Sequence, residues 1–235
     1  MLNPDELTEL KNQVARLANE VALLGDAQAI RKLQHAYGYY LDKCLYDEVV
    51  DLFSDDGELR FMGGIFCGKA GIRRLYCDRF RRNFTGGHNG PVYGFLLDHL
   101  QLQDIVDVAA DRRTAFARFR CLMQAGSHKS RQDAPATLPS QWWEGGIYEN
   151  IYVREDGVWK IKSLNYWLVY QGLYADGWAN MPPQPGPFFT TTFPDNPVGP
   201  DELAQVQPVL WPETDVVAFH YAHPVTGKRW QPPGG

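Results

Sequence analysis

The sequence has no long hydrophobic run and no excess of positive charge. No apolar stretch approaches the roughly 18–20 residues that a membrane-spanning helix needs, which argues against an integral membrane protein. Acidic residues outnumber basic ones, 28 to 23, and the net charge of −5 gives no reason to expect nucleic acid or an anionic membrane as partner. The first residues, MLNPDELTELKN, are acidic and lack an apolar core, so we expect no secretory signal and a cytoplasmic location.

Cysteine is also scarce. The four cysteines, at positions 44, 67, 77 and 121, are scattered and include no CxxC pair. We interpret them as reduced thiols rather than as a disulfide framework or a zinc site. His220 and His223 are close in the sequence but have no third ligand near them, so the sequence predicts no metal site.

Proline is rare before residue 171, whereas twelve of the sixteen prolines lie in residues 171–235. Regular secondary structure should therefore be sparse in that segment. The segment also holds Trp178, Trp211 and Trp230, and a disordered tail is usually poor in aromatic residues. We expect residues 171–235 to form an extended arm that packs on the domain or on a neighbouring subunit.

Residues 1–25 carry apolar side chains at alternating intervals of three and four. This a/d spacing predicts a helix of about three heptads, capped by Asn3 or Asp5. The helix could dock on its own domain, or it could pack across a subunit interface in a homo-oligomer, a dimer or a trimer. Gly25-Asp26 interrupts the pattern and predicts a second helix that ends near Cys44. The apolar positions of the first helix are Leu7, Leu10, Val14, Leu17, Val21 and Leu24.

The rest of the chain changes from helical to strand patterns. The pattern predicts a short strand at 58–62 after a turn at 54–57, and a basic helix at 69–84. We expect Arg79, Arg81 and Arg82 on a solvated face of that helix rather than at an anion site, and GGHNG (86–90) as a mobile lip of a pocket. Four long strands are predicted at 95–108, 114–124, 141–154 and 158–170. This order indicates an α+β fold, with helices covering one face of a curved antiparallel sheet.

A set of short motifs occurs in this frame, in a fixed order and spacing. The chain has Tyr37, Leu41-Asp42, Tyr46-Asp47, Leu52-Phe53, Asp55-Asp56-Gly57, His99 and the DGVWKI run at 156–161. Over residues 26–170 this arrangement resembles the SnoaL-like branch of the NTF2-like superfamily. The resemblance implies a cone, in which the curved sheet wraps around the N-terminal helices and encloses one deep pocket.

The resemblance also implies a catalytic pair. In scytalone dehydratase-like members, an Asp at the position of Asp42 works with a His at the position of His99. Asp42 falls in the last turn of a helix, where a carboxylate is unfavourable, and a site with raised pKa would explain it. Tyr148 matches a substrate-binding Asn of those enzymes, and Met123 stands near where they have a second His. We therefore expect Asp42, His99 and Tyr148 to be catalytic.

Other polar residues are expected to bind the substrate. Strand alternation places Gln101 and Gln103 on the face of His99, and Tyr39 lies three residues before Asp42. For each candidate, packing in the core or a solvated surface position is the alternative interpretation. The expected substrate-binding residues are Tyr39, Lys43, Gln101, Glu144, Asn165 and Trp167.

The resemblance implies a lyase without a cofactor that acts on a small aromatic substrate. The patterns GYYLDK, DHLQLQ, EGGIYEN and EDGVWKIKSLNYW resemble bacterial lyases of lignin-derived diarylpropanes. Such a reaction eliminates water through a quinone methide and can release formaldehyde. Two alternatives stay open. The protein could be a dehydratase or isomerase of a steroid, bile acid or polyketide, or it could bind a small molecule without turnover.

Overall fold

A computed structural model describes residues 3–136, 138–183 and 186–232. It begins with one 39-residue helix, α1 (Pro4–Asp42), where the sequence predicted two helices. The Asn3 side chain and Glu6 form a capping box at its start, as expected of an N-terminal cap. Gly25 does not break α1, because a helix tolerates a glycine at a cost of about 1 kcal/mol.

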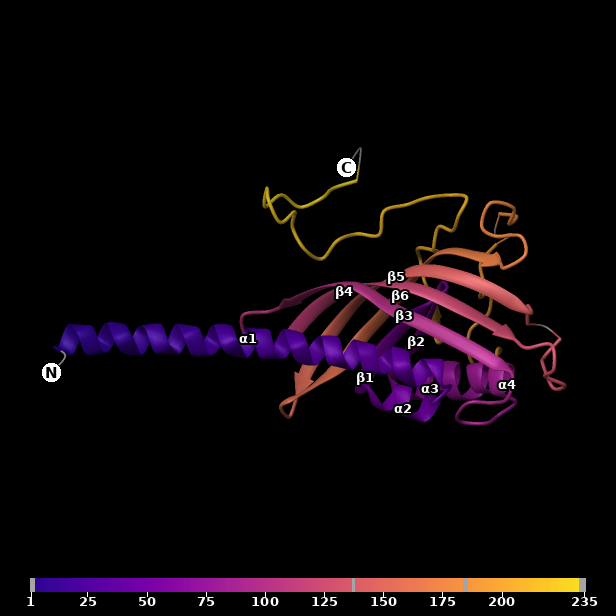
Figure 1. The fold of residues 1–235 in the computed structure, drawn as a ribbon, viewed down its shortest axis with the longest axis horizontal. Helices are drawn as coiled ribbons and strands as arrows, with labels where there is room; N and C mark the ends of the chain where they lie inside the picture. The colour runs from indigo at the N-terminus through magenta and orange to yellow at the C-terminus, as the bar shows by residue number, and fades with distance from the viewer. Residues whose placement is uncertain (1–2, 137, 184–185, 233–235) are drawn as a thin grey trace.

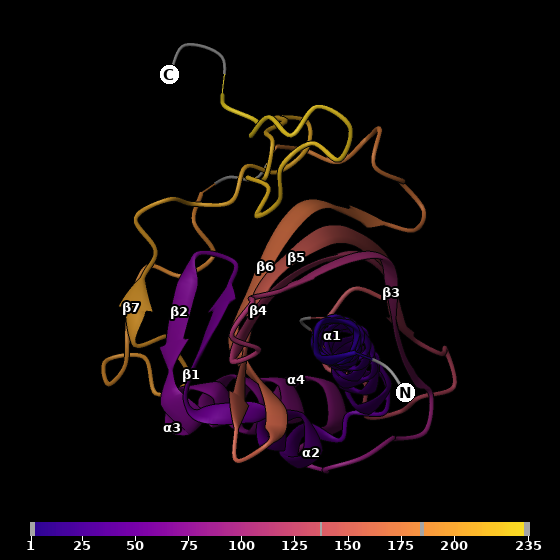
Figure 2. The ribbon, with the colours of Figure 1, turned by 90° about the vertical axis from the view of Figure 1, so that its left-hand side faces the viewer.

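The two halves of α1 have different surroundings. Residues 4–24 project from the body of the molecule, and their six apolar seam residues are between 44% and 71% exposed (Figure 1). From Asp26 onward the helix runs inside the curl of the sheet, where Ile30, Tyr37 and Leu41 are buried (Figure 2). Hydrophobic burial therefore anchors only the second half of α1 within this chain.

A second helical layer follows α1. Helix α2 (Tyr46–Asp51) leads into β1 (Phe53–Phe61), which already includes the residues predicted as a turn. After β2 (Gly64–Cys67), helix α3 (Gly68–Arg73) continues through a π-helix, η1 (Arg74–Phe80), into α4 (Arg81–Thr85). These three segments together correspond to the basic helix predicted at 69–84.

The four long strands are present as β3 (Phe95–Val108), β4 (Thr114–Ser127), β5 (Gln141–Glu155) and β6 (Val158–Leu173). The sheet order is β3-β4-β5-β6-β1-β2-β7, with β7 at Glu202–Leu203. All pairings are antiparallel except that of β1 with β6, which is parallel, so the sheet is mixed. A hairpin fixes an antiparallel direction, and no hairpin joins β1 to β6.

The pairing of the strands shifts register at four places, and two of these β-bulges reverse the inward and outward alternation that the sequence predicted for the site residues. In β3 the pairing advances from Leu102 to Ile105 while β4 advances by two residues, and Gln103 takes a φ of 51°. In β6 the residue Lys162 is extra, because Ile151 pairs with Ser163 and Tyr152 pairs with Ile161. A bulge adds one residue to one strand, so every residue beyond it changes face.

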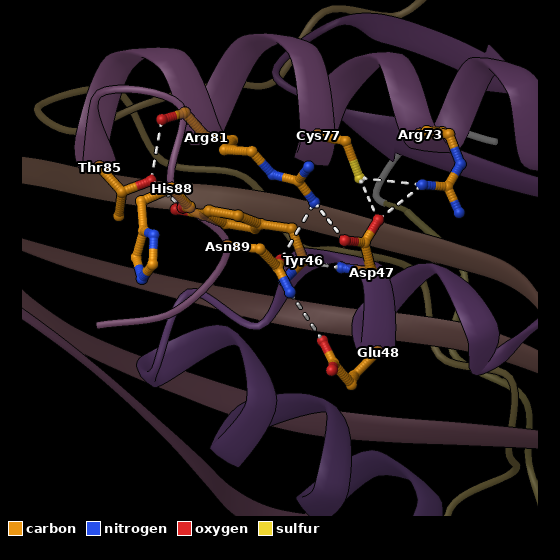
Figure 3. A network of polar contacts seen from close by, with 9 residues as sticks. All are labelled: Tyr46, Asp47, Glu48, Arg73, Cys77, Arg81, Thr85, His88 and Asn89. Carbon is orange, nitrogen blue, oxygen red and sulfur yellow. Dashed lines mark hydrogen bonds and ion pairs between the residues drawn. The ribbon is translucent and has the colours of Figure 1, made fainter. Parts of the chain in front are cut away.

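Figure 3 shows the polar contacts that hold α2 against the helical segment formed by α3, η1 and α4. The Asp47 carboxylate pairs with Arg73 at 2.6 Å and with Arg81 at 2.7 Å. The Asn89 side chain accepts hydrogen bonds from the backbone N–H groups of Tyr46 and Asp47, which caps α2. The GGHNG loop therefore fixes α2, and it does not line the cavity described below.

A network of polar side chains joins α1 to the sheet. The side-chain oxygen of Gln34, Oε1, accepts hydrogen bonds from Tyr152 Oη at 2.7 Å and from Asn150 Nδ2 at 3.1 Å. The Gln34 amide donates to Gln101 at 2.8 Å. Gly38 allows this close approach, since a Cβ there would meet the Gln101 side chain at 2.9 Å. We call Gln34, Gln101, Asn150 and Tyr152 the Gln34 network.

The C-terminal segment packs on its own domain. Phe189 is buried against Phe66 of β2, and Asp201 forms an ion pair with Arg74. Farther along, the segment crosses the outer face of the sheet (Figure 2). There His220 contacts Glu149. Within the described ranges, no helix combines the length and the hydrophobicity needed to span a membrane.

Candidate active site

A cavity of about 200 Å³ lies between α1, the helical segment 68–85 and the concave face of the sheet. Its wall is mostly apolar and aromatic, and the arm contributes Phe188 to it. The polar side chains on the wall are Tyr37, Tyr76, Arg79, Asn83, His99, Glu144, Tyr148, Tyr166 and Gln171.

Four cavity residues form one row across neighbouring strands. The register pairs His99 of β3 with Met123 of β4, Met123 with Glu144 of β5, and Glu144 with Gln171 of β6. Neighbouring strands lie about 4.8 Å apart, so the backbones of His99 and Glu144 are separated by roughly 10 Å. Two ionisable groups thus line the same cavity from positions on either side of an apolar Met123.

Asp42 lies behind His99, on the side away from the cavity. Its Oδ1 accepts a hydrogen bond of 2.7 Å from the backbone N–H of His99. The same oxygen lies 3.9 Å from His99 Nδ1, a buried atom that has no hydrogen-bond partner in the described part of the chain. The carboxylate therefore fixes the His99 backbone, and a small rotation of the imidazole would bring Nδ1 within hydrogen-bond distance of it.

Burial shifts the titration of both groups. It raises the pKa of Asp42 to about 6, with a further increase from the negative charge of Asp98. It lowers the pKa of His99 to about 4, because the charged imidazolium loses its hydration. At neutral pH the Asp42 carboxyl is therefore ionised and the His99 imidazole is neutral, which is the state of a general base.

Glu144 is a second group suited to proton transfer. Burial raises its pKa to about 7, although hydrogen bonds to its carboxylate oppose the shift. Its Oε1 accepts from Trp142 Nε1 at 3.2 Å and from Gln171 Nε2 at 2.8 Å. A carboxyl that titrates near neutral pH can donate or accept a proton at little cost in free energy.

Tyr148 belongs to an aromatic cluster on the cavity wall. Its ring lies 4.8 Å from the Tyr166 ring and 5.9 Å from the Tyr37 ring, and the Tyr37 hydroxyl bonds that of Tyr76 at 2.9 Å. Burial raises the pKa of all four phenols, so they are neutral hydrogen-bond groups. Gly146 makes room for the cluster, since a Cβ there would overlap the Tyr166 ring.

The other predicted substrate-binding residues lie outside the cavity. Tyr39 is 74% exposed and lines, with Asp42 and Gln101, a separate shallow groove beside the edge strand β3. Lys43 is the C-cap of α1 and lines neither the cavity nor this groove. Gln101 has its side chain engaged in the Gln34 network.

Asn165 and Trp167 do not line the cavity either, although alternation counted from Trp159 predicted that they would. The bulge at Lys162 reverses the alternation, so Leu164 and Tyr166 face the cavity instead. In the same way, the bulge near Gln103 moves the residues of β3 beyond it to the other face of the sheet. The polar run predicted at His99, Gln101 and Gln103 therefore ends at Gln101.

Three of the cavity residues that were not predicted show what the sequence could and could not indicate. Arg79 was assigned to a solvated face, yet it shared a stripe with Tyr76 and Phe80 in the sequence, which was a usable indication. Tyr166 could be placed only with the bulge known. Phe188 lies in the arm, whose path along the domain has no local sequence pattern.

Within the described residues, no group of three or more His, Cys, Asp or Glu side chains is arranged to hold a metal ion.

The chain was compared with known protein families and solved structures. The SnoaL-like domain family matches residues 22–165, which is more than half of the chain. The chain belongs to the SnoaL-like domain family. The fold is accordingly that of the NTF2-like superfamily.

Solved structures share this fold at low sequence identity. A scytalone dehydratase-like protein from Novosphingobium aromaticivorans is 20% identical with a TM-score of 0.50, over 72% of this chain and 96% of its own. The structure of LinA is 18% identical with a TM-score of 0.53, over 71% and 99%. A type 2 hexachlorocyclohexane dehydrochlorinase is 21% identical with a TM-score of 0.53, over the same shares. No curated protein sequence matches the chain.

The family and the cavity together support a small-molecule-processing enzyme. The substrate and the reaction are not given by the likeness, because structures at this level of identity share the fold alone.

Proposed function

We propose that this SnoaL-like protein is a lyase that needs no cofactor and acts on a phenolic aromatic substrate. The observation that carries the proposal is the row across the sheet, in which His99 and Glu144 line one apolar cavity from either side of Met123. A neutral imidazole and a carboxyl that titrates near pH 7 are a general base and a general acid. Elimination of water needs these two groups and a positioned substrate.

The chemistry starts from a para-phenol with a benzylic hydroxyl. His99 takes the phenol proton, electrons move through the ring, and the benzylic C–O bond breaks. The hydroxyl leaves as water with the proton of Glu144, and a quinone methide forms. Asp42 stabilises the His99 imidazolium that results, because its carboxylate is close and ionised. Tyr148 donates a hydrogen bond to a substrate oxygen.

The quinone methide is an electron sink for a second bond cleavage. When the neighbouring carbon carries a hydroxymethyl group, Glu144 takes the proton of that hydroxyl. The C–C bond then breaks, formaldehyde leaves, and the electron pair forms the new double bond and restores the aromatic ring. His99 returns its proton to the phenol oxygen. This is the diarylpropane reaction, and its products are a stilbene, water and formaldehyde.

The size of the cavity limits what it can enclose. A protein cavity of about 150 Å³ binds benzene, so about 200 Å³ suits one substituted ring. The second ring of a diarylpropane would then lie outside this cavity, next to the arm that contributes Phe188.

The test is an incubation of the purified protein with phenolic 1,3-diols and benzylic alcohols, one-ring and two-ring, without added cofactor. Conjugated product is followed by absorbance and formaldehyde by a colorimetric assay. Product with formaldehyde supports the diarylpropane reaction, and product without it supports a dehydratase. Binding without turnover by any compound, including steroid and polyketide alcohols, overturns the enzyme proposal in favour of a binding protein.

We further propose that the projecting half of α1 pairs with the same segment of a second copy. The exposed seam has valine at two of its three a positions, Val14 and Val21, and leucine at all three d positions, which favours a parallel two-stranded coiled coil. A Leu17→Asp variant should then shift the mass in solution from dimer to monomer, measured by light scattering. Asn19→Asp adds the same charge on the opposite face and is the control. A monomeric wild type overturns this proposal.

A further inference from the structure

The π-helix η1 places one arginine on the cavity wall. Residues Arg74–Phe80 form this wider turn between α3 and α4, and Arg79 is its penultimate residue. A π-turn inserts one residue and rotates the side chains around it, and such turns are frequent at functional sites. Arg79 lines the cavity together with Tyr76 and Phe80 from the same turn.

Arg79 differs from Arg73, Arg74 and Arg81 in its partners. Arg73 and Arg81 pair with Asp47, and Arg74 pairs with Asp201. No ion pair of Arg79 with a carboxylate occurs in residues 3–136, 138–183 and 186–232, and burial is what lowers the pKa of its guanidinium. Its contacts are the faces of two aromatic rings of the arm.

The two rings fix the guanidinium without neutralising it. The Arg79 Cζ atom lies 5.2 Å from the centroid of Phe188 and 5.0 Å from that of Phe189. These rings stabilise the cation through their electron-rich faces, but they accept none of its five N–H donors as a carboxylate would. A partly buried cation of this kind favours an anionic ligand, because the ligand restores the lost electrostatic stabilisation.

We infer that Arg79 binds the phenolate oxygen of the aromatic substrate and thereby selects substrates with an ionisable hydroxyl on the ring. The inference deepens the proposed function and rests on it for the identity of the substrate. Expulsion of a benzylic hydroxyl needs electrons from the opposite side of the ring, and a phenolate supplies them more readily than a phenol. The other ionisable groups on the cavity wall are His99, Glu144 and the four tyrosines Tyr37, Tyr76, Tyr148 and Tyr166.

The experiment measures binding and needs no turnover. The probe is 4-nitrophenol, whose phenolate is coloured, titrated with pH by absorbance in the presence of saturating full-length protein. The neutral isostere 4-nitrotoluene and the carboxylate 4-nitrobenzoate are bound in parallel by calorimetry. We expect a bound phenol pKa at least about one unit below that of the free probe, which is a tenfold preference for the phenolate.

Variants assign the preference to Arg79. Arg79→Gln should abolish the shift of the probe pKa and weaken phenolate binding about tenfold, with 4-nitrotoluene binding unchanged. Arg79→Lys should keep part of the shift. Arg82→Gln removes the same charge from an exposed position of α4 and should behave as wild type. Circular dichroism confirms that each variant is folded.

Three results of the binding experiment would overturn the inference. They are an unshifted probe pKa in the wild type, a shift that persists in folded Arg79→Gln, or tighter Arg79-dependent binding of 4-nitrobenzoate than of the phenolate. The proposed lyase activity fails independently. A phenolate preference without turnover of any diol removes the lyase and leaves the Arg79 assignment, whereas turnover unaffected by Arg79→Gln removes only the assignment.

Discussion

Two groups of polar side chains lie between α1 and the sheet, and they differ in how far their hydrogen bonds are satisfied. In the Gln34 network, the Gln34 oxygen accepts two hydrogen bonds and its amide donates one. On the cavity wall, the Tyr166 hydroxyl is buried without a partner in the described part of the chain, and so is Nδ1 of the wall residue His99, on the Asp42 side of its ring. A buried polar atom without a partner costs about 1–3 kcal/mol, so unpaired groups around a cavity indicate a ligand.

The comparison separates two kinds of buried polarity. The Gln34 network fixes α1 against β3 and β5, and its loss should affect stability. The cavity groups are available to a substrate, and their loss should affect chemistry. The predictions below test this separation, and they begin with the largest effect.

Replacement of His99 should remove catalysis and leave the fold intact. His99→Gln keeps the size and polarity of the side chain but removes the base, so kcat/KM for a turned-over diol should fall about 10²–10⁴-fold. The melting temperature should change little, since Nδ1 has no partner to lose. A variant that retains wild-type kcat/KM would show that His99 is not the base.

Gln34→Leu should have the opposite profile. Leucine has a similar volume but leaves Gln101, Asn150 and Tyr152 without their partner, so the free energy of unfolding should fall by about 3 kcal/mol. Denaturant titration measures this loss, and kcat per folded molecule should stay within about twofold of the wild type. A loss of kcat without a loss of stability would break the comparison.

Glu144 should make stability depend on pH. Its pKa in the folded protein, about 7, lies above the model-compound value of 4.5. The folded state therefore binds this proton more tightly, and the stabilisation present below pH 4.5 is lost as the pH rises through 7. Each unit of difference between the folded and unfolded pKa corresponds to about 1.4 kcal/mol, so the free energy of unfolding should be lower by about 3 kcal/mol at pH 8 than below pH 4.5.

Glu144→Gln isolates this contribution. The variant should be less dependent on pH than the wild type between pH 4.5 and 8, and more stable at pH 8, as measured by thermal unfolding. Equal pH dependence of the two proteins would show that Glu144 is not buried and ionisable in the way the cavity indicates.

A pair of tyrosine variants gives the smallest and sharpest contrast. Tyr152→Phe removes a hydroxyl that donates to Gln34 and should cost about 1 kcal/mol of stability. Tyr166→Phe removes a buried hydroxyl that has no partner among the described residues, and its stability should equal or exceed that of the wild type. Equal losses in both variants, measured by denaturant titration, would contradict the division into paired and unpaired groups.

The sequence by itself determined the local parts of this protein. Alternating patterns and polar turns gave the four long strands within a few residues, because strand alternation and turn conformation depend on adjacent residues. The resemblance to SnoaL-like proteins, carried by the motif around Asp42, implied that Asp42 and His99 lie together, and the His99 backbone N–H does donate to Asp42. The same motifs predicted the SnoaL-like family, and the match of that family to residues 22–165 confirms the prediction.

Only the tertiary structure decided which side chains share the cavity. The bulge at Lys162 excludes Asn165 and Trp167 and admits Tyr166, since the position of a bulge is set by pairing with a neighbouring strand. Arg79 reaches the wall through a π-turn, and Phe188 reaches it along an arm with no regular pattern. These placements depend on contacts between residues far apart in the chain, and neither local propensity nor periodicity contains that information.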